Sequence, residues 1–146
     1  MGAPPRDSNN RVVPHDDADI PDDACVLRMI VSQWLKEHPS LIGRRRLSSG
    51  AFSPSSKERD PYQGMSVDLL QPLLDAGLSP ADRKGQKYEA IVKFRVRDLR
   101  ELGLHVGPDP LDTNPFHAGV WGCKSGTRTK LMKLYEWVDR PDDVIP

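Results

Sequence analysis

Cysteine, aromatic residues and long apolar runs are all scarce in this chain. Its two cysteines, Cys25 and Cys123, allow a single bridge, and nothing in their spacing resembles a disulfide framework or a zinc quartet. No run of about 18 apolar residues occurs, and the opening "MGAPPRDSNN" lacks the apolar core of a signal peptide. We therefore expect reduced thiols, a cytoplasmic location and no membrane partner.

The recurrent motifs of nucleotide-binding and hydrolytic enzymes are also missing. The chain contains no G-x-x-x-x-G-K-[ST], G-x-G-x-x-G, H-E-x-x-H or G-x-S-x-G. Each motif places phosphate-binding amides, metal ligands or a nucleophile at a fixed spacing, so these classes lose support. We expect neither a cofactor nor a metal site.

Net charge is absent overall, yet the charges are unevenly distributed. The 21 basic and 21 acidic residues cancel, but residues 1–24 hold two arginines and six aspartates, which leaves the remainder mildly basic. Proline is plentiful, at 14 residues, and favours long irregular connections. The composition predicts a disordered acidic leader over residues 1–23 and a single domain over residues 24–146.

Apolar periodicity indicates that strands and helices alternate along this domain. The expected elements are a buried strand at 24–31, a helix at 31–38, an extended piece at 46–52, a helix capped by Ser66 and ended by Gly77, a strand at 87–96, a short helix ended by Gly103, strands at 104–106 and 117–123, and a helix at 127–139. This order predicts an α+β fold: a single layer of mixed or antiparallel sheet, with helices packed on one face and long proline-rich loops.

Arg28 is an unusual residue because it lies in the middle of the apolar segment "ACVLRMIV". A guanidinium buried without a partner costs several kcal/mol, so Arg28 must be paired or must face a cleft. An internal carboxylate such as Glu89 or Asp68 would satisfy it. A phosphate or carboxylate of a ligand would do so equally well.

His117 lies where the loop "DPLDTNPF" becomes the apolar segment "HAGVWG". An imidazole titrates near neutral pH and can act as a general base, but no second histidine or cysteine stands at metal-ligand spacing. The alternative is a ring that bonds a loop carbonyl and fixes the start of the strand. We expect the ring to be partly exposed and close to Arg28 or Ser66.

The segment "RRRLSSGAF" places three arginines before two serines and a glycine. Such a basic cluster meets polyanions, but few aromatic residues accompany it, so nucleic acid is an unlikely partner and a solvated loop is favoured. We expect a cleft for an anionic small molecule or an acidic partner segment, with the 44–59 loop at its rim. The candidate ligand-binding residues are Arg28, Ser49, Ser66 and His117, and the basic rim is Arg44, Arg45 and Arg46.

Two resemblances accompany these residues. The blocks "SSGAF", "GMSVDLL", "RELGLHVGPDPL" and "NPFHAGVWG" resemble those of short bacterial proteins to which no activity is assigned, over residues 24–139. The order of Arg28, Ser48 or Ser49, and Glu89 is similar to that of ADP-ribosyltransferases, although the S-T-S and paired-glutamate motifs are missing. That second resemblance implies, as the alternative to a binding module, a nucleotide-acting enzyme that uses Arg28, Ser49 and Glu89.

Overall fold

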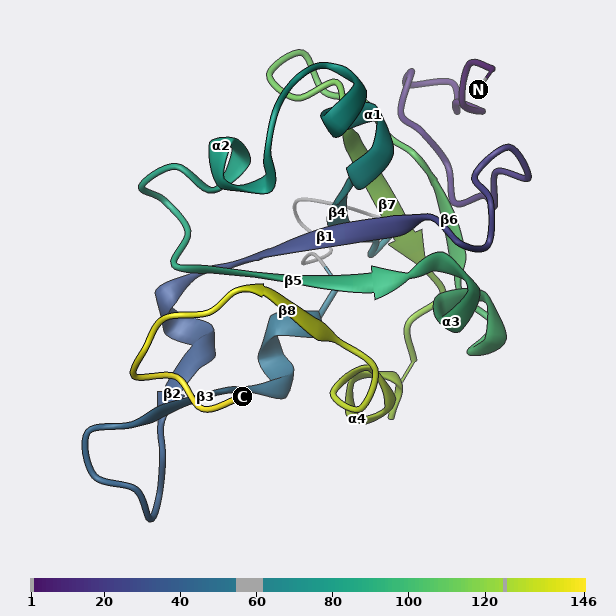
Figure 1. Ribbon diagram of the computed structural model, residues 1–146. Coiled ribbons are helices and arrows are strands. Elements are labelled where there is room, and N and C mark those ends of the chain that lie inside the picture. Colours follow the sequence, from purple (N-terminus) through teal and green to yellow (C-terminus); the bar gives the residue numbers. More distant parts are fainter. Residues whose placement is uncertain (1, 55–61, 125) are drawn as a thin grey trace.

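A six-stranded antiparallel sheet forms the centre of the molecule in the computed structural model, which describes residues 2–54, 62–124 and 126–146 (Figure 1). The strand order is β6-β7-β4-β1-β5-β8, and β2 and β3 form a separate hairpin. The strands are β1 (Cys25–Ile30), β2 (Leu35–Glu37), β3 (Arg45–Leu47), β4 (Met65–Leu69), β5 (Ala90–Arg95), β6 (His105–Pro108), β7 (His117–Trp121) and β8 (Glu136–Asp139). The predicted α+β class with an antiparallel sheet is confirmed.

Short helices connect these strands and lie on both sides of the sheet. They are η1 (Ser32–Trp34), η2 (Ser49–Phe52), α1 (Leu70–Asp75), α2 (Pro80–Lys84), α3 (Val96–Glu101) and α4 (Thr127–Leu131), where η denotes a 3-10 helix. Figure 1 shows α1 and α2 on one side of β1 and β5, with α4 and the β2–β3 hairpin on the other.

The main core lies on the face that η2, α3 and α4 cover. These helices contribute Phe52, Leu99 and Leu131 to a cluster with strand residues such as Val26 and Phe94, all almost completely buried. A smaller cluster on the opposite face joins Leu27, Met29 and Ile91 to side chains of α1 and the α2–β5 loop. Burial on both faces explains why β1 is apolar at nearly every position rather than alternating.

Three of the expected helices are partly or wholly strand. Residues 31–38 form the short 3-10 helix η1 and then β2, whose residues pair with β3, so the expected helix is reduced to one 3-10 turn. Ser66 lies inside β4 rather than at a helix cap, because Met65–Leu69 pairs with β7, and α1 begins only at Leu70. The last helix ends at Leu131, and Glu136–Asp139 joins the sheet edge as β8. In each case strand pairing overrides the local helical pattern.

Other expectations hold closely. The strands predicted at 24–31 and 87–96 are β1 and β5, and they pair along six consecutive positions from Cys25–Arg95 to Ile30–Ala90. Gly77 and Gly103 follow α1 and α3 with φ of 79° and 81°, the left-handed geometry that ends a helix and that favours glycine. Two boundaries set by backbone chemistry are therefore confirmed.

The acidic leader lies against the sheet edge in the structure, unlike the disordered segment that its composition predicts. Ile20 is only 3% exposed, and the Asp17 amide donates to the carbonyl of Val106 on the edge strand β6 at 2.9 Å. The Arg100 guanidinium binds carboxylates of Asp16 and Asp22 at 3.1 and 2.8 Å. Two of the six leader aspartates, Asp16 and Asp22, thus bind one arginine, and the segment covers part of a strand edge.

No helix among the described residues is long and apolar enough to cross a membrane. Cys25 and Cys123 are both free thiols, each partly buried.

Candidate functional site

A cleft opens where β1 and β4 separate. These strands pair at Val26–Leu69 and Leu27–Asp68, whereas β1 pairs with β5 along its whole length. The cleft has a volume of about 1200 Å³ and is lined by β1, η1, η2, β4, the α2–β5 loop and the turn before β7. It therefore draws on segments spread over nearly a hundred residues of chain, and this volume suits a ligand of nucleotide size.

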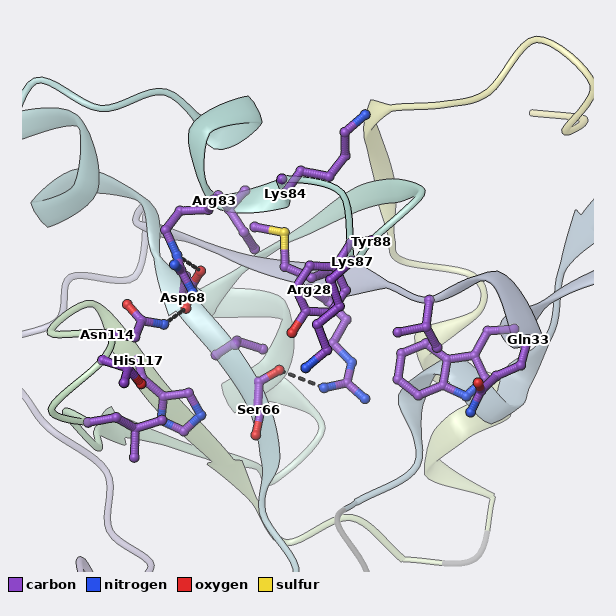
Figure 2. Close-up of a pocket in the computed structure, with 18 of the residues that line it drawn as sticks. Arg28, Gln33, Ser66, Asp68, Arg83, Lys84, Lys87, Tyr88, Asn114 and His117 are labelled. Atoms are coloured by element: carbon purple, nitrogen blue, oxygen red, sulfur yellow. Dashed lines mark hydrogen bonds and ion pairs between the residues drawn. The ribbon is translucent and has the colours of Figure 1, made fainter.

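Arg28 projects from β1 into this opening. Its Nε donates to the carbonyl of Ala51 at 2.9 Å, and its Nη1 donates to the carbonyl of Ser66 at 2.7 Å. The guanidinium carbon lies 4.7 Å from the centre of the Trp34 ring, a cation–π distance. Figure 2 shows the guanidinium beside Ser66 in the cleft. The carbonyl of Ser66 thus accepts from a side chain at the point where a neighbouring strand amide would otherwise donate.

Arg28 has no acidic partner among the described residues. Of the two expected partners, Asp68 is bonded by Arg83 and Asn114, at 3.1 and 2.7 Å. Glu89 pairs with Arg45 at 2.9 Å. The internal-carboxylate alternative for Arg28 is therefore wrong for these residues, and both carboxylates serve other cations.

The electrostatics of the Arg28 guanidinium follow from its burial, since the residue is only 8% exposed. Burial lowers the pKa of Arg28 to about 10, an effect that Tyr88 and Cys123 partly oppose. The group therefore stays charged at neutral pH. Two of its five N–H bonds point at carbonyls, and Nη2 makes no hydrogen bond to the described residues.

Other cations line the same cleft, from α2 and the loop that follows it. Arg83 is paired with Asp68 and Lys84 with Asp139, at 3.1 and 2.5 Å. Lys87 has no ion pair in the described part of the chain, and its Nζ lies 5.2 Å from the centre of the Tyr88 ring. Asp68 is the single carboxylate among the described residues that line the cleft. The two cations without an acidic partner, Arg28 and Lys87, therefore dominate the potential of the cleft.

His117 lines the far end of the cleft, and its side chain is 13% exposed. Nδ1 lies 2.7 Å from the carbonyl of Asp109 and 3.5 Å from its carboxylate. Because a carbonyl oxygen only accepts, we assign the proton of the neutral ring to Nδ1, which leaves the lone pair on Nε2. The ring thus bonds a loop carbonyl, as expected of a histidine that fixes the start of the strand. It also lines the cleft, as expected of a histidine in a ligand site.

The structure brings together three of the four candidate ligand-binding residues. Arg28, Ser66 and His117 line one cleft, whereas Ser49 is exposed in η2 and does not line it. The arginine cluster is also elsewhere: Arg45 pairs with Asp143 and Glu89 beside the C-terminal segment, and none of residues 44–46 lines the cleft. The expected basic rim is therefore replaced by cations of α2 and its loop. Residues 55–59 of the predicted rim lie outside the described residues.

The cations that sequence reasoning missed come from "SPADRKGQKYE". Ser79 and Asp82 form a capping box that starts α2, and Gly85, with φ of 54°, ends it. No local pattern placed these cations beside Arg28, because their position depends on the pairing of β5 with β1.

The described residues contain no group of three histidine, cysteine or carboxylate side chains that could hold a metal ion. No protein family, curated protein or solved structure with which the chain was compared matches it. The function is therefore proposed from the geometry and charge of the cleft.

Proposed function

We propose that this protein is a binding module for a small anionic molecule that carries a phosphate or carboxylate group. One observation supports this proposal above the others. Arg28 is a buried cation that lines the cleft, and within the described part of the chain its guanidinium is bonded by two carbonyls and by no carboxylate. This arrangement leaves the N–H donors of Nη2 available for an anion.

The energetic reason is the cost of an uncompensated buried charge. Desolvation disfavours the charged form of Arg28, and carbonyl dipoles replace only part of the lost hydration. An anion at Nη2 would add a charge-assisted hydrogen bond in a region that bulk water screens weakly, so binding would offset part of this cost.

The remainder of the lining supports a ligand with a less polar body. Leu27, Met29, Val31 and Leu111 line the cleft together with Tyr88. Ligand sites combine an apolar lining with a few polar groups that fix orientation. An anionic head at Arg28 and Lys87 with an uncharged body toward His117 fits this distribution.

An ADP-ribosyltransferase-like reaction receives less support from the same cleft. It would require Ser49 and Glu89 to act on one dinucleotide with Arg28, yet neither residue lines the cleft, and Glu89 is paired with Arg45. An acidic segment of a partner protein would engage the same cations. Release of nicotinamide from NAD⁺ by the purified protein would favour the enzyme over the binding module.

Titration with inorganic phosphate tests the proposal, followed through the indole N–H signals of the three tryptophans in NMR spectra. Trp34 lies against Arg28, so its signal should shift as phosphate is added and stop shifting when the site is saturated. The signals of Trp121 and Trp137 should not shift. Arg28→Met should abolish the shift. Arg46→Met removes an exposed arginine outside the cleft and should leave it intact. Equal responses of the two variants would contradict the proposal.

A further inference from the structure

Ser66 and His117 are neighbours on the floor of the cleft. In the register of β4 and β7, Ser66 pairs with Gly119 and Asp68 pairs with His117. His117 is two positions from Gly119 on β7, so Ser66 and His117 are diagonal neighbours. Diagonal neighbours on adjacent strands lie on one face of a sheet, and their side chains can reach one another. Figure 2 shows the His117 ring and the Ser66 side chain next to each other in the cleft.

The His117 ring is oriented to accept a proton from the cleft side. Its Nδ1 is held by the carbonyl of Asp109 at 2.7 Å, with the Asp109 carboxylate at 3.5 Å. This leaves Nε2 with a lone pair. The nearby carboxylate would stabilise the imidazolium that forms on protonation.

Ser66 and His117 present complementary groups that lack other partners. The Ser66 hydroxyl and His117 Nε2 make no hydrogen bond to the described residues. The backbone of Ser66 is fixed, because its carbonyl accepts from Arg28 and its strand pairs with β7. A hydroxyl donor and a ring acceptor therefore face the same space, beside the anchor for an anion.

We infer that the cleft hydrolyses esters that carry an anionic group, with Ser66 as the nucleophile and His117 as the general base. This inference rests on the proposed function, because Arg28 holds the anionic group of the substrate. A nucleophile beside an oriented base defines such sites by geometry, without a fixed sequence motif.

The reaction balances with water as the only co-reactant. Ser66 Oγ forms a bond to the ester carbonyl carbon while its proton passes to His117 Nε2. The bond from that carbon to the alcohol oxygen breaks, and the alcohol leaves with the proton from Nε2. Water then attacks the acyl-serine with His117 again as the base, which releases the carboxylic acid and restores Ser66.

Labelling with a fluorophosphonate, read by intact mass, tests the nucleophile. The full chain should gain one adduct, and Ser66→Ala should gain none. Ser53→Ala is the matched control, because Ser53 lines the same cleft but its hydroxyl accepts from Arg128 at 3.1 Å. His117→Gln should react at least about 100-fold more slowly, which is the usual contribution of a general base. Labelling of Ser66→Ala at the rate of the unmodified protein would overturn the inference.

Ester hydrolysis separates this inference from the proposed function. We expect the protein to hydrolyse 4-nitrophenyl succinate, whose acyl part is anionic, and Arg28→Met to raise KM for this ester more than it raises KM for neutral 4-nitrophenyl butyrate. If phosphate shifts the Trp34 signal but Ser66 is neither labelled nor required for hydrolysis, the binding role remains and the inference fails. If Ser66 reacts but no anion binds at Arg28, the proposed function fails.

Discussion

Arg28 is held by carbonyls rather than by a carboxylate, and this decides what its removal does. Loss of one member of a buried ion pair leaves an orphaned charge and costs about 3–5 kcal/mol. Removal of the Arg28 guanidinium leaves the carbonyls of Ala51 and Ser66 without their hydrogen-bond donor. It also removes a charge that burial disfavours. These effects oppose one another.

We therefore expect Arg28→Met to change the free energy of unfolding by less than about 2 kcal/mol. Urea denaturation of the ligand-free protein measures it. Arg83→Met is the comparison, because it strips a partner from the buried Asp68 carboxylate and should destabilise more. A larger loss for Arg28→Met than for Arg83→Met would mean that Arg28 is chiefly structural.

The pKa of Arg28 sets an upper pH limit on anion binding. Since burial lowers this pKa to about 10, the guanidinium loses its charge as the pH rises through about 10, well below the range of a free arginine. We expect sulfate affinity to be constant from pH 7 to about 9 and to fall above it. Lys87→Gln removes the other lining cation that has no acidic partner among the described residues, and the decline should persist in that variant. A flat profile to about pH 12 would place the anion elsewhere.

Some residues of the cleft could be predicted from the sequence, and others could not. Arg28 was identifiable because a charge in an apolar strand requires a partner, and His117 because it begins a strand after a turn-rich loop. Lys87 and Arg83 were not, since their place in the cleft depends on how the α2–β5 loop crosses the sheet. Ser49 was misplaced because η2 turns it to solvent.

At the scale of the elements, the packing of Trp121 against β7 requires a glycine at position 119. Trp121 lies across Gly119 so closely that a Cβ there would stand 2.3 Å from the indole. Gly119→Ala should therefore displace the indole and destabilise the fold by about 1–3 kcal/mol, the usual cost of overpacking. Thermal unfolding followed by near-ultraviolet circular dichroism, which reports on tryptophan packing, measures both effects. Gly85→Ala is the comparison, since nothing lies within 4 Å of its Cβ position and only its φ of 54° opposes the change. Unchanged near-ultraviolet spectra would contradict the contact.

The leader is the element on which composition and structure differ most. Ile20 is nearly completely buried, so Ile20→Ala should cost about 2–5 kcal/mol, whereas a disordered leader would make it neutral. Urea denaturation distinguishes the two outcomes, with the exposed Asp19→Ala as the control. Equal stability of both variants would restore the prediction of a dispensable leader.

Element boundaries were predictable where backbone chemistry sets them and unpredictable where pairing does. Gly77 and Gly103 end helices because their φ values suit glycine. By contrast, β2 and β8 are short segments whose apolar spacing fits a helix equally well, and they become strands because β3 and β5 offer edges to pair with. Such long-range competition is invisible to a local pattern.

At the scale of the whole molecule, Arg45 of β3 binds the C-terminal segment through Asp143. Its guanidinium donates to both carboxylate oxygens of Asp143, at 2.6 and 3.0 Å, and this holds the pKa of Asp143 below its usual range. A lowered pKa in the folded state stabilises above the unfolded value and loses that effect as the pH falls through the folded value. We expect Asp143→Asn to be less stable than the unmodified protein at pH 6.

That difference should disappear as the pH falls from about 4 to 2, because the carboxylate then becomes neutral. Thermal unfolding across this range measures it, with Asp142→Asn, an exposed neighbour, as the control. A difference that persists at pH 2 would mean that Asp143 acts through packing rather than charge.

The early separation of β1 from β4 also has a mechanical consequence. Two residue pairs join the half-sheet β6-β7-β4 to the half-sheet β1-β5-β8, and the Arg28 side chain bridges them just beyond. Under a shearing force a sheet yields first along its shortest ladder, so the molecule should divide along this line into two three-stranded halves. A ligand bound at Arg28 would contact both halves and link them non-covalently. Its presence should therefore raise the force needed to separate the two halves.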